Sequence, residues 1–232
     1  MCGRFTLTRF PDEWSALLEL PPFSPQPPRY NIAPSQYILT ILRDPESPRP
    51  MAQLLVWGLL PAWAKDKNAA QRAINARAET AAEKPTFRAA LRHRRALIPV
   101  DGFYEWSGTG ANRHPYYFQM WDGRPFAIAG LWEHWEGPAG EMIDSCALLT
   151  TVPNALIAPL HHRMPVILAP DQFRRWLDPN VQSGRDLTPM LTPFPAEAMR
   201  VTRVSRRVNS VTHDAPACIR AAEADPPPGP LS

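Results

Sequence analysis

The stretch that decides the fold is ALIPVDGFYEW at residues 96–106, followed by SGTGANR at 107–113 and HPYYFQM at 114–120. The outer two segments are rich in aromatic and branched apolar residues. The segment between them contains Gly and Asn, which favour tight turns. Two apolar runs separated by such a turn predict a β-hairpin, and therefore an antiparallel sheet in the middle of the chain.

Further strands and a few helices are expected on both sides of this hairpin. Strands are predicted over 37–42, 53–60, 125–135 and 144–152, and a last strand followed by a loop over 199–211. Helices are predicted over 11–20, over 169–177 and in the second part of 73–95, where Pro85 fits a first helical turn. Residues 21–36 are expected to form a proline-rich loop.

These elements predict an α+β fold that is β-rich, with curved antiparallel sheets in a barrel-like arrangement and short flanking helices. The chain has 232 residues, of which 44% are hydrophobic, so it is long and apolar enough for one sizeable core. We expect a single domain over residues 2–220. The tail at 221–232, which contains DPPPGP, is expected to be disordered.

Composition also limits the cellular context and the class of partner. The net charge is only +3, which by itself does not indicate nucleic acid. Three widely spaced cysteines argue against a disulfide framework, and no metal-ligand spacing occurs. No run of about 18 apolar residues is present. We therefore expect a reduced, cytoplasmic monomer that does not contact a membrane and uses neither a metal nor another cofactor.

Cys2 is the most unusual residue in the sequence. If Met1 is removed, an amine and a thiol lie on adjacent carbons of one residue. The α-amine has a pKa of about 7.7–8.0, so a useful fraction is neutral at physiological pH. The amine can form a Schiff base with an aldehyde, and the thiol can then close a five-membered thiazolidine ring. The alternative is a cysteine that only fills space in the core.

Glu105 lies in the hairpin's first strand. Alternation places it on the same face as Phe103, with Tyr104 and Trp106 on the other face. A carboxylate among apolar groups should be partly desolvated, which raises its pKa and suits a general acid or base. A salt-bridged glutamate at a sheet edge fits the motif equally well. Asp101 competes for the same role, although Asp-Gly is typical of a turn.

Other candidate groups are polar, basic and aromatic. Asn75 and Arg77, in INARAET, could orient an intermediate and bind phosphate, whereas Glu79 is expected to be a surface charge of a capped helix. His161 and His162 precede a predicted strand, and one of them could move a proton. Trp63 is surrounded by cations including Arg88, a pattern typical of single-strand binding; a solvated helix end is the alternative.

Eight blocks in order resemble the SOS response-associated peptidase family, also called abasic-site processing proteins. The blocks are MCGRF, YNIAPSQ, WGLLPAWAKD, INARAET, RRALIPVDGFYEW, FAIAGLWE, TTVPNALIAPLHHRMPVIL and VSRRVNSV. The resemblance runs from Cys2 to about residue 220. It implies a compact β-rich domain that forms a thiazolidine with the ring-opened sugar of an abasic site in single-stranded DNA. The adduct shields the lesion during repair.

The resemblance also implies residue roles. Cys2 is the nucleophile, Asn75 orients the intermediate, Glu105 is the acid or base and His161 assists ring opening and Schiff-base chemistry. The DNA backbone is bound by Arg4 and Arg77, and Arg88 is a further candidate. Pro34 and Trp63 stack or wedge beside the lesion. His162 fills a place often held by Asp or Glu, and Ala64 replaces a second aromatic residue.

Three other functions remain open from the sequence. Class II glutamine amidotransferases also begin with MCG, so an N-terminal-nucleophile amidohydrolase is one alternative. An autopeptidase could use Cys2, Glu105 and His161 to cleave the Met1–Cys2 bond. A third alternative is a single-strand-binding module without covalent chemistry.

Overall fold

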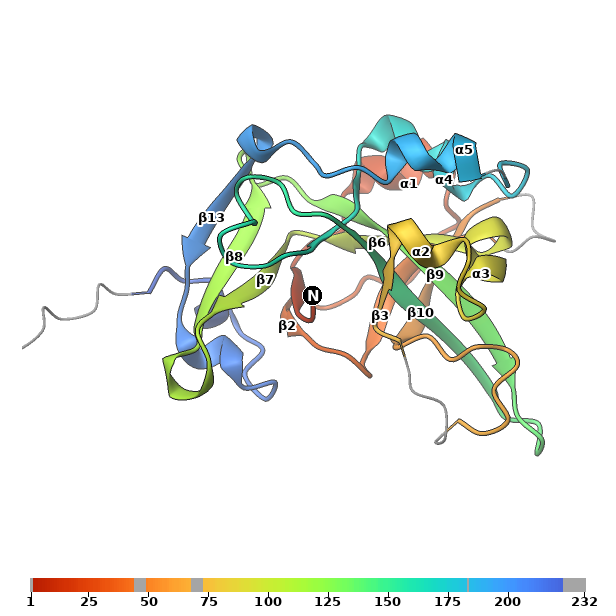
Figure 1. The fold of residues 1–232 in the computed structure, drawn as a ribbon, viewed down its shortest axis with the longest axis horizontal. Helices are drawn as coiled ribbons and strands as arrows, with labels where there is room; N and C mark the ends of the chain where they lie inside the picture. The colour runs from red at the N-terminus through yellow and green to blue at the C-terminus, as the bar shows by residue number, and fades with distance from the viewer. Residues whose placement is uncertain (1, 44–48, 68–72, 183, 223–232) are drawn as a thin grey trace, which may run out of the picture.

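A computed structural model describes residues 2–43, 49–67, 73–182 and 184–222. The thirteen strands of these ranges form two sheets, and the short helices lie around them (Figure 1). No helix in the described ranges combines the length and the apolar character needed to cross a membrane. The predicted disorder of the tail concerns residues that, from 223 onward, lie outside the described ranges.

Five strands close into a barrel. β10 pairs with β4, β4 with β3, β3 with β6, β6 with β9, and β9 again with β10. The short strands β5, β11 and β12 pair with β10 or β9 at the side of this ring. The strands of this sheet are β3 (Tyr37–Leu42), β4 (Met51–Trp57), β5 (Asn75–Arg77), β6 (Arg95–Val100), β9 (Phe126–Glu136), β10 (Met142–Thr151), β11 (Met164–Pro165) and β12 (Ile167–Leu168).

A second, five-stranded sheet lies beside the barrel in the order β13-β8-β7-β1-β2. The predicted hairpin forms its centre, with Phe103 opposite Phe118 and Glu105 opposite Tyr116. Its strands are β1 (Phe5–Leu7), β2 (Arg29–Ile32), β7 (Gly102–Ser107), β8 (His114–Met120) and β13 (Met199–Arg203).

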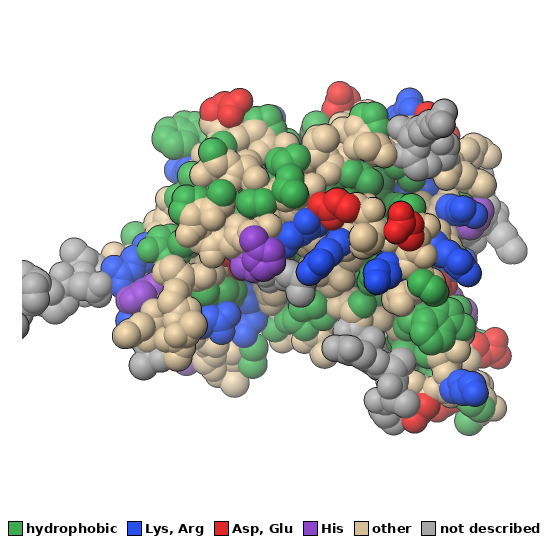
Figure 2. Space-filling view, viewed as in Figure 1, with side chains coloured by type: hydrophobic (Ala, Val, Ile, Leu, Met, Phe, Trp, Pro, Cys, Tyr) green, Lys and Arg blue, Asp and Glu red, His purple; other side chains and the backbone are tan. Residues whose placement is uncertain are grey.

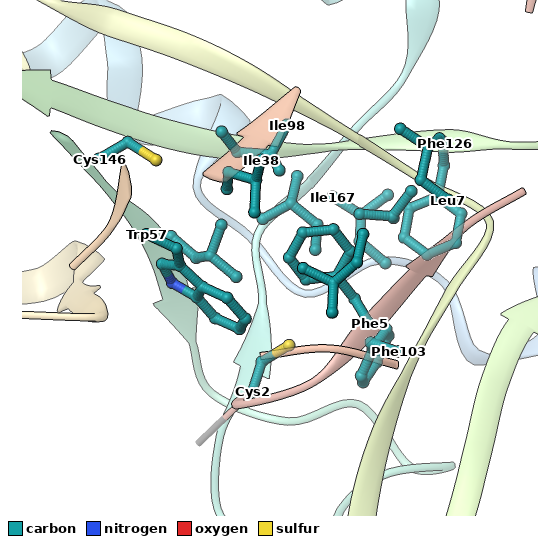
Figure 3. Packing of buried hydrophobic residues seen from close by; sticks show 14 of the residues in the cluster. Cys2, Phe5, Leu7, Ile38, Trp57, Ile98, Phe103, Phe126, Cys146 and Ile167 are labelled. Atoms are coloured by element: carbon teal, nitrogen blue, oxygen red, sulfur yellow. The ribbon is translucent and has the colours of Figure 1, made fainter. Parts of the chain in front are cut away.

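The largest buried cluster takes side chains from both sheets. Phe103 and Phe118 stack at 5.2 Å between ring centroids, and Phe5 contacts Trp57 at 5.1 Å. Cys2 belongs to this cluster (Figure 3). Because strand residues alternate, the neighbouring residues of β6, β9 and β10 face outward into a second apolar cluster covered by helices.

The helices are short and lie outside the barrel (Figure 1). Trp14 and Leu18 of the first helix pack with Phe173 and Trp176 against the outward-facing barrel residues. The α-helices are α1 (Asp12–Leu18), α2 (Ala78–Ala81), α3 (Arg88–His93), α4 (Phe173–Leu177) and α5 (Gly184–Leu187). The 3₁₀ turns are η1 (Gly110–Asn112), η2 (Pro170–Gln172), η3 (Thr188–Met190), η4 (Ala196–Ala198), η5 (Arg206–Asn209) and η6 (Pro216–Cys218).

The predicted fold class is confirmed, with differences in detail. The predicted sheets were antiparallel, but β10 pairs in parallel with β4 and β5. β2 lies inside the predicted proline-rich loop, and β5 lies in a segment expected to be a loop. Strands of three or four residues are too short to show an alternating pattern. They form here because strands distant in the sequence offer their edges: β10 pairs with β5, and β1, itself paired with β7, pairs with β2.

The barrel interior predicts a specific stability effect. Ile98 on β6 is fully buried in the cluster shared by the sheets, whereas Leu54 on β4 is 43% exposed. Ile98→Ala should lower the free energy of unfolding by about 2–5 kcal/mol because it leaves a cavity. Leu54→Ala is the matched control and should cost less than about 1 kcal/mol. Urea unfolding of both variants measures the difference, and equal losses would contradict this placement of the two residues.

Candidate active site

Cys2 lies between the two sheets, at the start of the segment that becomes β1. β1 pairs with β2 on one side and with β7 on the other, so the position of Cys2 is set by the sheet. The side chain is fully buried. Burial raises the pKa of the thiol far above its ordinary value, and the charge of Glu105 raises it further. The thiol is therefore protonated at neutral pH.

Asn75 holds Cys2 from the barrel side. It begins β5, which pairs in parallel with β10 so that Asn75 lies opposite Leu148. Its Nδ2 donates a hydrogen bond of 2.9 Å to the carbonyl oxygen of Cys2. Its Oδ1 is buried and accepts no hydrogen bond from the described residues. Asn75 thus fixes the residue and offers an acceptor next to it.

Glu105 approaches from the other sheet. As the alternation predicted, it shares a face with Phe103 of the main cluster, while Tyr104 and Trp106 pack in a different cluster. Only 3% of Glu105 is exposed. Burial raises the pKa of this carboxyl to about 7, so it can both accept and donate a proton near neutral pH. Asp101 occupies the turn before β7 and accepts a hydrogen bond from the Thr8 N–H.

His161 ends a loop that Asn154 organises. The Asn154 Oδ1 accepts hydrogen bonds from the backbone N–H groups of Leu156 and Ile157, both at 3.1 Å. Nδ1 of His161 lies 3.0 Å from the backbone nitrogen of Arg163 and 3.1 Å from its carbonyl oxygen, so the backbone of Arg163 holds the ring in place. Burial lowers the pKa of His161, which favours the neutral ring. His162 is exposed and stacks on His161 at 4.4 Å between ring centroids.

An ion pair between the buried Arg163 and Glu79 at the surface ties this loop to α2. Arg163 is 7% exposed and donates two hydrogen bonds to Glu79, of 2.7 and 2.8 Å. A third donor of the guanidinium reaches the Thr150 carbonyl oxygen at 2.5 Å. Glu79 was expected to be a surface charge; it lies at the surface but is paired, because the loop brings Arg163 to it. The pairing with Arg163 lowers the pKa of Glu79.

A cleft of about 430 Å³ opens beside Cys2. Arg4 and Pro34 line it together with Glu105 and His161. The Nη1 of Arg4 donates to Asn31 Oδ1 at 2.8 Å and to the Val208 carbonyl oxygen at 2.9 Å, which fixes the guanidinium at the cleft wall. Burial lowers the pKa of Arg4. Four of the residues singled out from the sequence therefore meet around one cavity, and Cys2 is adjacent to it.

Three predicted DNA-binding residues do not line this cleft. Trp63 is 65% exposed in the loop after β4. Ala64, which follows it, is buried against Trp135 and accepts a hydrogen bond from the indole through its carbonyl oxygen. Arg77 is exposed at the end of β5, and Arg88 is exposed at the start of α3. Arg77 nevertheless shares a short strand, and by alternation a face, with Asn75.

Sequence reasoning missed two groups at the cleft. Arg113 and Trp106 also line it, with the guanidinium 4.3 Å from the ring centroid. Arg113 lies in the turn of the hairpin, where the sequence indicated only turn formation. The alternation placed Trp106 on the face opposite Glu105 but could not show that its ring reaches the rim. Figure 2 shows one face of the molecule, where Lys and Arg side chains form a row across the middle beside a His side chain.

Comparison with known proteins places this arrangement in a family. The family model described as SOS response associated peptidase (SRAP) matches residues 1–211. Abasic site processing protein YoqW of Bacillus subtilis (strain 168) is 40% identical over 225 residues, which is 95% of this chain and 100% of the relative. Abasic site processing protein YoaM of the same organism is 42% identical over 214 residues, which is 90% of this chain and 93% of the relative.

A solved structure agrees with the fold. The crystal structure of a protein from Bacteroides thetaiotaomicron superimposes with a TM-score of 0.84 at 27% identity, covering 96% of this chain and 100% of that chain. The family match, the identity to two relatives over nearly their whole length and the shared fold confirm the resemblance carried by the eight sequence blocks. The chain belongs to the SOS response associated peptidase (SRAP) family.

Proposed function

We propose that this protein senses abasic sites in single-stranded DNA and binds them covalently through Cys2 once Met1 has been removed. The adduct shields the lesion during repair. The observation that carries this proposal is the position of Cys2, which is held by Asn75 beside a cleft that Glu105, His161 and Arg4 line. Relatives at 40% and 42% identity are named abasic site processing proteins, which supports a role in processing DNA lesions.

The chemistry needs only the two nucleophiles of Cys2 and the aldehyde of the ring-opened sugar. The amine adds to C1′ and forms a carbinolamine, which loses water to give an imine. The thiol then adds across the C=N bond, and its proton passes to the nitrogen. The product is a thiazolidine, and one water is released. A buried, protonated thiol suits this order because the amine attacks first and the ring closes within one molecule.

The neighbouring groups can move the protons. Glu105, with its pKa raised to about 7 by burial, can take a proton from the Cys2 ammonium and return it to the departing hydroxyl. In the neutral tautomer whose Nδ1 accepts from the Arg163 N–H, His161 can donate from Nε2 to the sugar ring oxygen as the ring opens. The buried Oδ1 of Asn75 can accept a hydrogen bond from the Cys2 nitrogen or from a sugar hydroxyl.

The DNA strand would be held mainly by its phosphates. Arg4 at the cleft wall and Arg77 on the strand of Asn75 flank Cys2, and Arg88 lies farther out on α3. Pro34 at the cleft and the exposed Trp63 offer surfaces for wedging and stacking. No base has to be read, because the missing base is itself the recognised feature.

Replacing Cys2 tests the covalent step. Cys2→Ala keeps an amine but has no thiol, so only a reversible imine can form and heat-stable crosslinks to an abasic oligonucleotide should disappear. Cys2→Ser should give a labile adduct because the oxygen ring opens more easily. A denaturing gel and the mass of the product measure this. Wild-type amounts of heat-stable crosslink in the alanine variant would overturn the proposal.

The free amine can be tested separately. A glutamate inserted between Met1 and Cys2 should block removal of the methionine, and the amide nitrogen of Cys2 then cannot form an imine. We expect loss of the crosslink, with the intact terminus verified by mass spectrometry. The control is a cleavable leader that leaves Cys2 as the first residue, which should restore crosslinking. Full activity of the blocked protein would show that the amine is not required.

The role of Glu105 predicts a pH-dependent effect. At pH 7 most of the Cys2 amine is protonated, so a base is needed; at pH 9 the amine is already neutral. Glu105→Gln should therefore slow crosslinking by about 100-fold at pH 7 and by less than about tenfold at pH 9. Single-turnover rates measure the ratio, and thermal unfolding checks that the variant is folded. A ratio that does not change between these pH values would contradict the base role.

A further inference from the structure

A basic ridge continues the cleft across the edge of the second sheet. We define the basic ridge as Arg113, His114, Arg203 and Arg206. The Nη2 of Arg203 donates to Nδ1 of His114 at 2.8 Å, and the Nη2 of Arg206 lies 3.4 Å and 3.3 Å from the two ring nitrogens. Two guanidinium groups thus share one imidazole, which concentrates positive charge at the surface.

The ridge is fixed to the rim of the cleft. Asn209, at the end of η5, accepts a hydrogen bond of 2.8 Å from the Trp106 indole and donates one of 3.3 Å to the Arg113 carbonyl oxygen. The guanidinium group of Arg113 lies over the same Trp106 ring in a cation–π contact. The turn that bears Arg206 is therefore joined to the hairpin that bears Glu105.

Two members of the ridge, Arg113 and Arg206, present positive charge at the surface. In the part of the chain that the structure describes, neither Arg113 nor Arg206 forms an ion pair with a carboxylate, and both side chains are exposed. Arg113 also lines the cleft together with Glu105, so the ridge extends into the cleft wall. Guanidinium groups held this close together favour the binding of an anion with several oxygen atoms.

The ridge lies across the cleft from Arg77. In Figure 1 the N-terminal segment is between the two sheets, with α2, which directly follows Arg77, on one side and β13, which ends at Arg203, on the other. A strand whose damaged sugar reaches Cys2 must leave the cleft in two directions. Arg77 can contact the strand where it leaves the cleft on one side, and the ridge can contact it on the other side.

We propose that the basic ridge binds the backbone phosphates of the DNA strand on one side of the lesion, opposite the side bound by Arg77. This inference rests on the proposed function. Each arginine that contacts a phosphate releases counterions from the DNA, so its removal weakens binding and reduces the salt dependence by about 0.7 in the logarithmic slope for a single strand. Different residues would therefore bind the DNA strand on the two sides of the lesion: the basic ridge on one side and Arg77 on the other.

The test measures reversible binding by fluorescence anisotropy. The probes are single strands that carry a tetrahydrofuran abasic analogue, which has no aldehyde, with ten nucleotides on one side and two on the other, and the mirror arrangement. Wild-type protein should bind both long-flank probes more tightly than a probe with two nucleotides on each side. A long flank on the ridge side should strengthen binding about tenfold over the short-flank probe, and Arg206→Ala and Arg113→Ala should each abolish this gain in affinity. Arg77→Ala should instead abolish the gain in affinity that comes from a long flank on the opposite side.

Arg200→Ala is the matched control. Arg200 is exposed on β13 but lies near the other end of that strand, next to Gly123, and by alternation faces away from Arg203. The Arg200→Ala variant removes one positive charge, as the ridge variants do, but leaves the ridge intact. The gain in affinity from each long flank should therefore be unchanged. Ridge variants that behave like Arg200→Ala would overturn the inference, provided that wild-type protein crosslinks an aldehyde-bearing strand with short flanks. If wild-type protein fails to crosslink that strand, the proposed function itself is wrong.

Discussion

The structure depends on burying the N-terminal segment between two sheets. Phe5 packs on Trp57 of the barrel while β1 pairs with both neighbours in the second sheet, so the first residues cannot move independently of the core. The hydrogen bond from Asn75 to the Cys2 carbonyl adds a connection to the barrel wall. Chain termini are ordinarily among the most mobile parts of a protein. Here Cys2 is fully buried and its carbonyl oxygen accepts a hydrogen bond from Asn75.

The same part of the fold buries a carboxyl group, that of Glu105, of which only 3% is exposed. Burial raises the pKa of Glu105 from its ordinary 4.5 to about 7, so the folded state binds its proton more tightly than the unfolded state does. The group therefore contributes most to stability below pH 4.5, and that contribution is lost as the pH rises through about 7. Near neutral pH the fold holds an unfavourable ionised carboxylate next to Cys2. A site selected for stability alone would place an apolar residue there.

The part of the site that could be predicted from the sequence is the part set by local pattern. Alternation in the hairpin correctly placed Glu105 on the face of Phe103 and separated it from Tyr104. β1, β2 and β5 escaped detection because three or four residues carry no clear period, and their pairing comes from distant strands.

Long-range contacts account for the residues that were missed. The pairing of Glu79 with Arg163 joins residues 84 positions apart, and nothing near Glu79 in the sequence indicates it. The same is true of Asn209 and Trp106, 103 positions apart, whose hydrogen bond brings the basic turn to the cleft. Motif order identified the family, but motif order does not show which side chains of two blocks touch.

The ion pair of Arg163 with Glu79 illustrates what these long-range contacts contribute. Its net stabilisation is small, because the Glu79 side chain is 45% exposed and solvent screens the attraction. Its effect is positional: the backbone nitrogen and carbonyl oxygen of Arg163 lie 3.0 Å and 3.1 Å from Nδ1 of His161, so fixing Arg163 also fixes the position of the ring. Cys2, Glu105 and His161 are thus held by three different parts of the fold, namely β1, the hairpin and the loop before β11. Because β1 pairs with β7 of the hairpin, the positions of Cys2 and Glu105 are linked through the second sheet, and the cleft keeps its shape without a substrate to organise it.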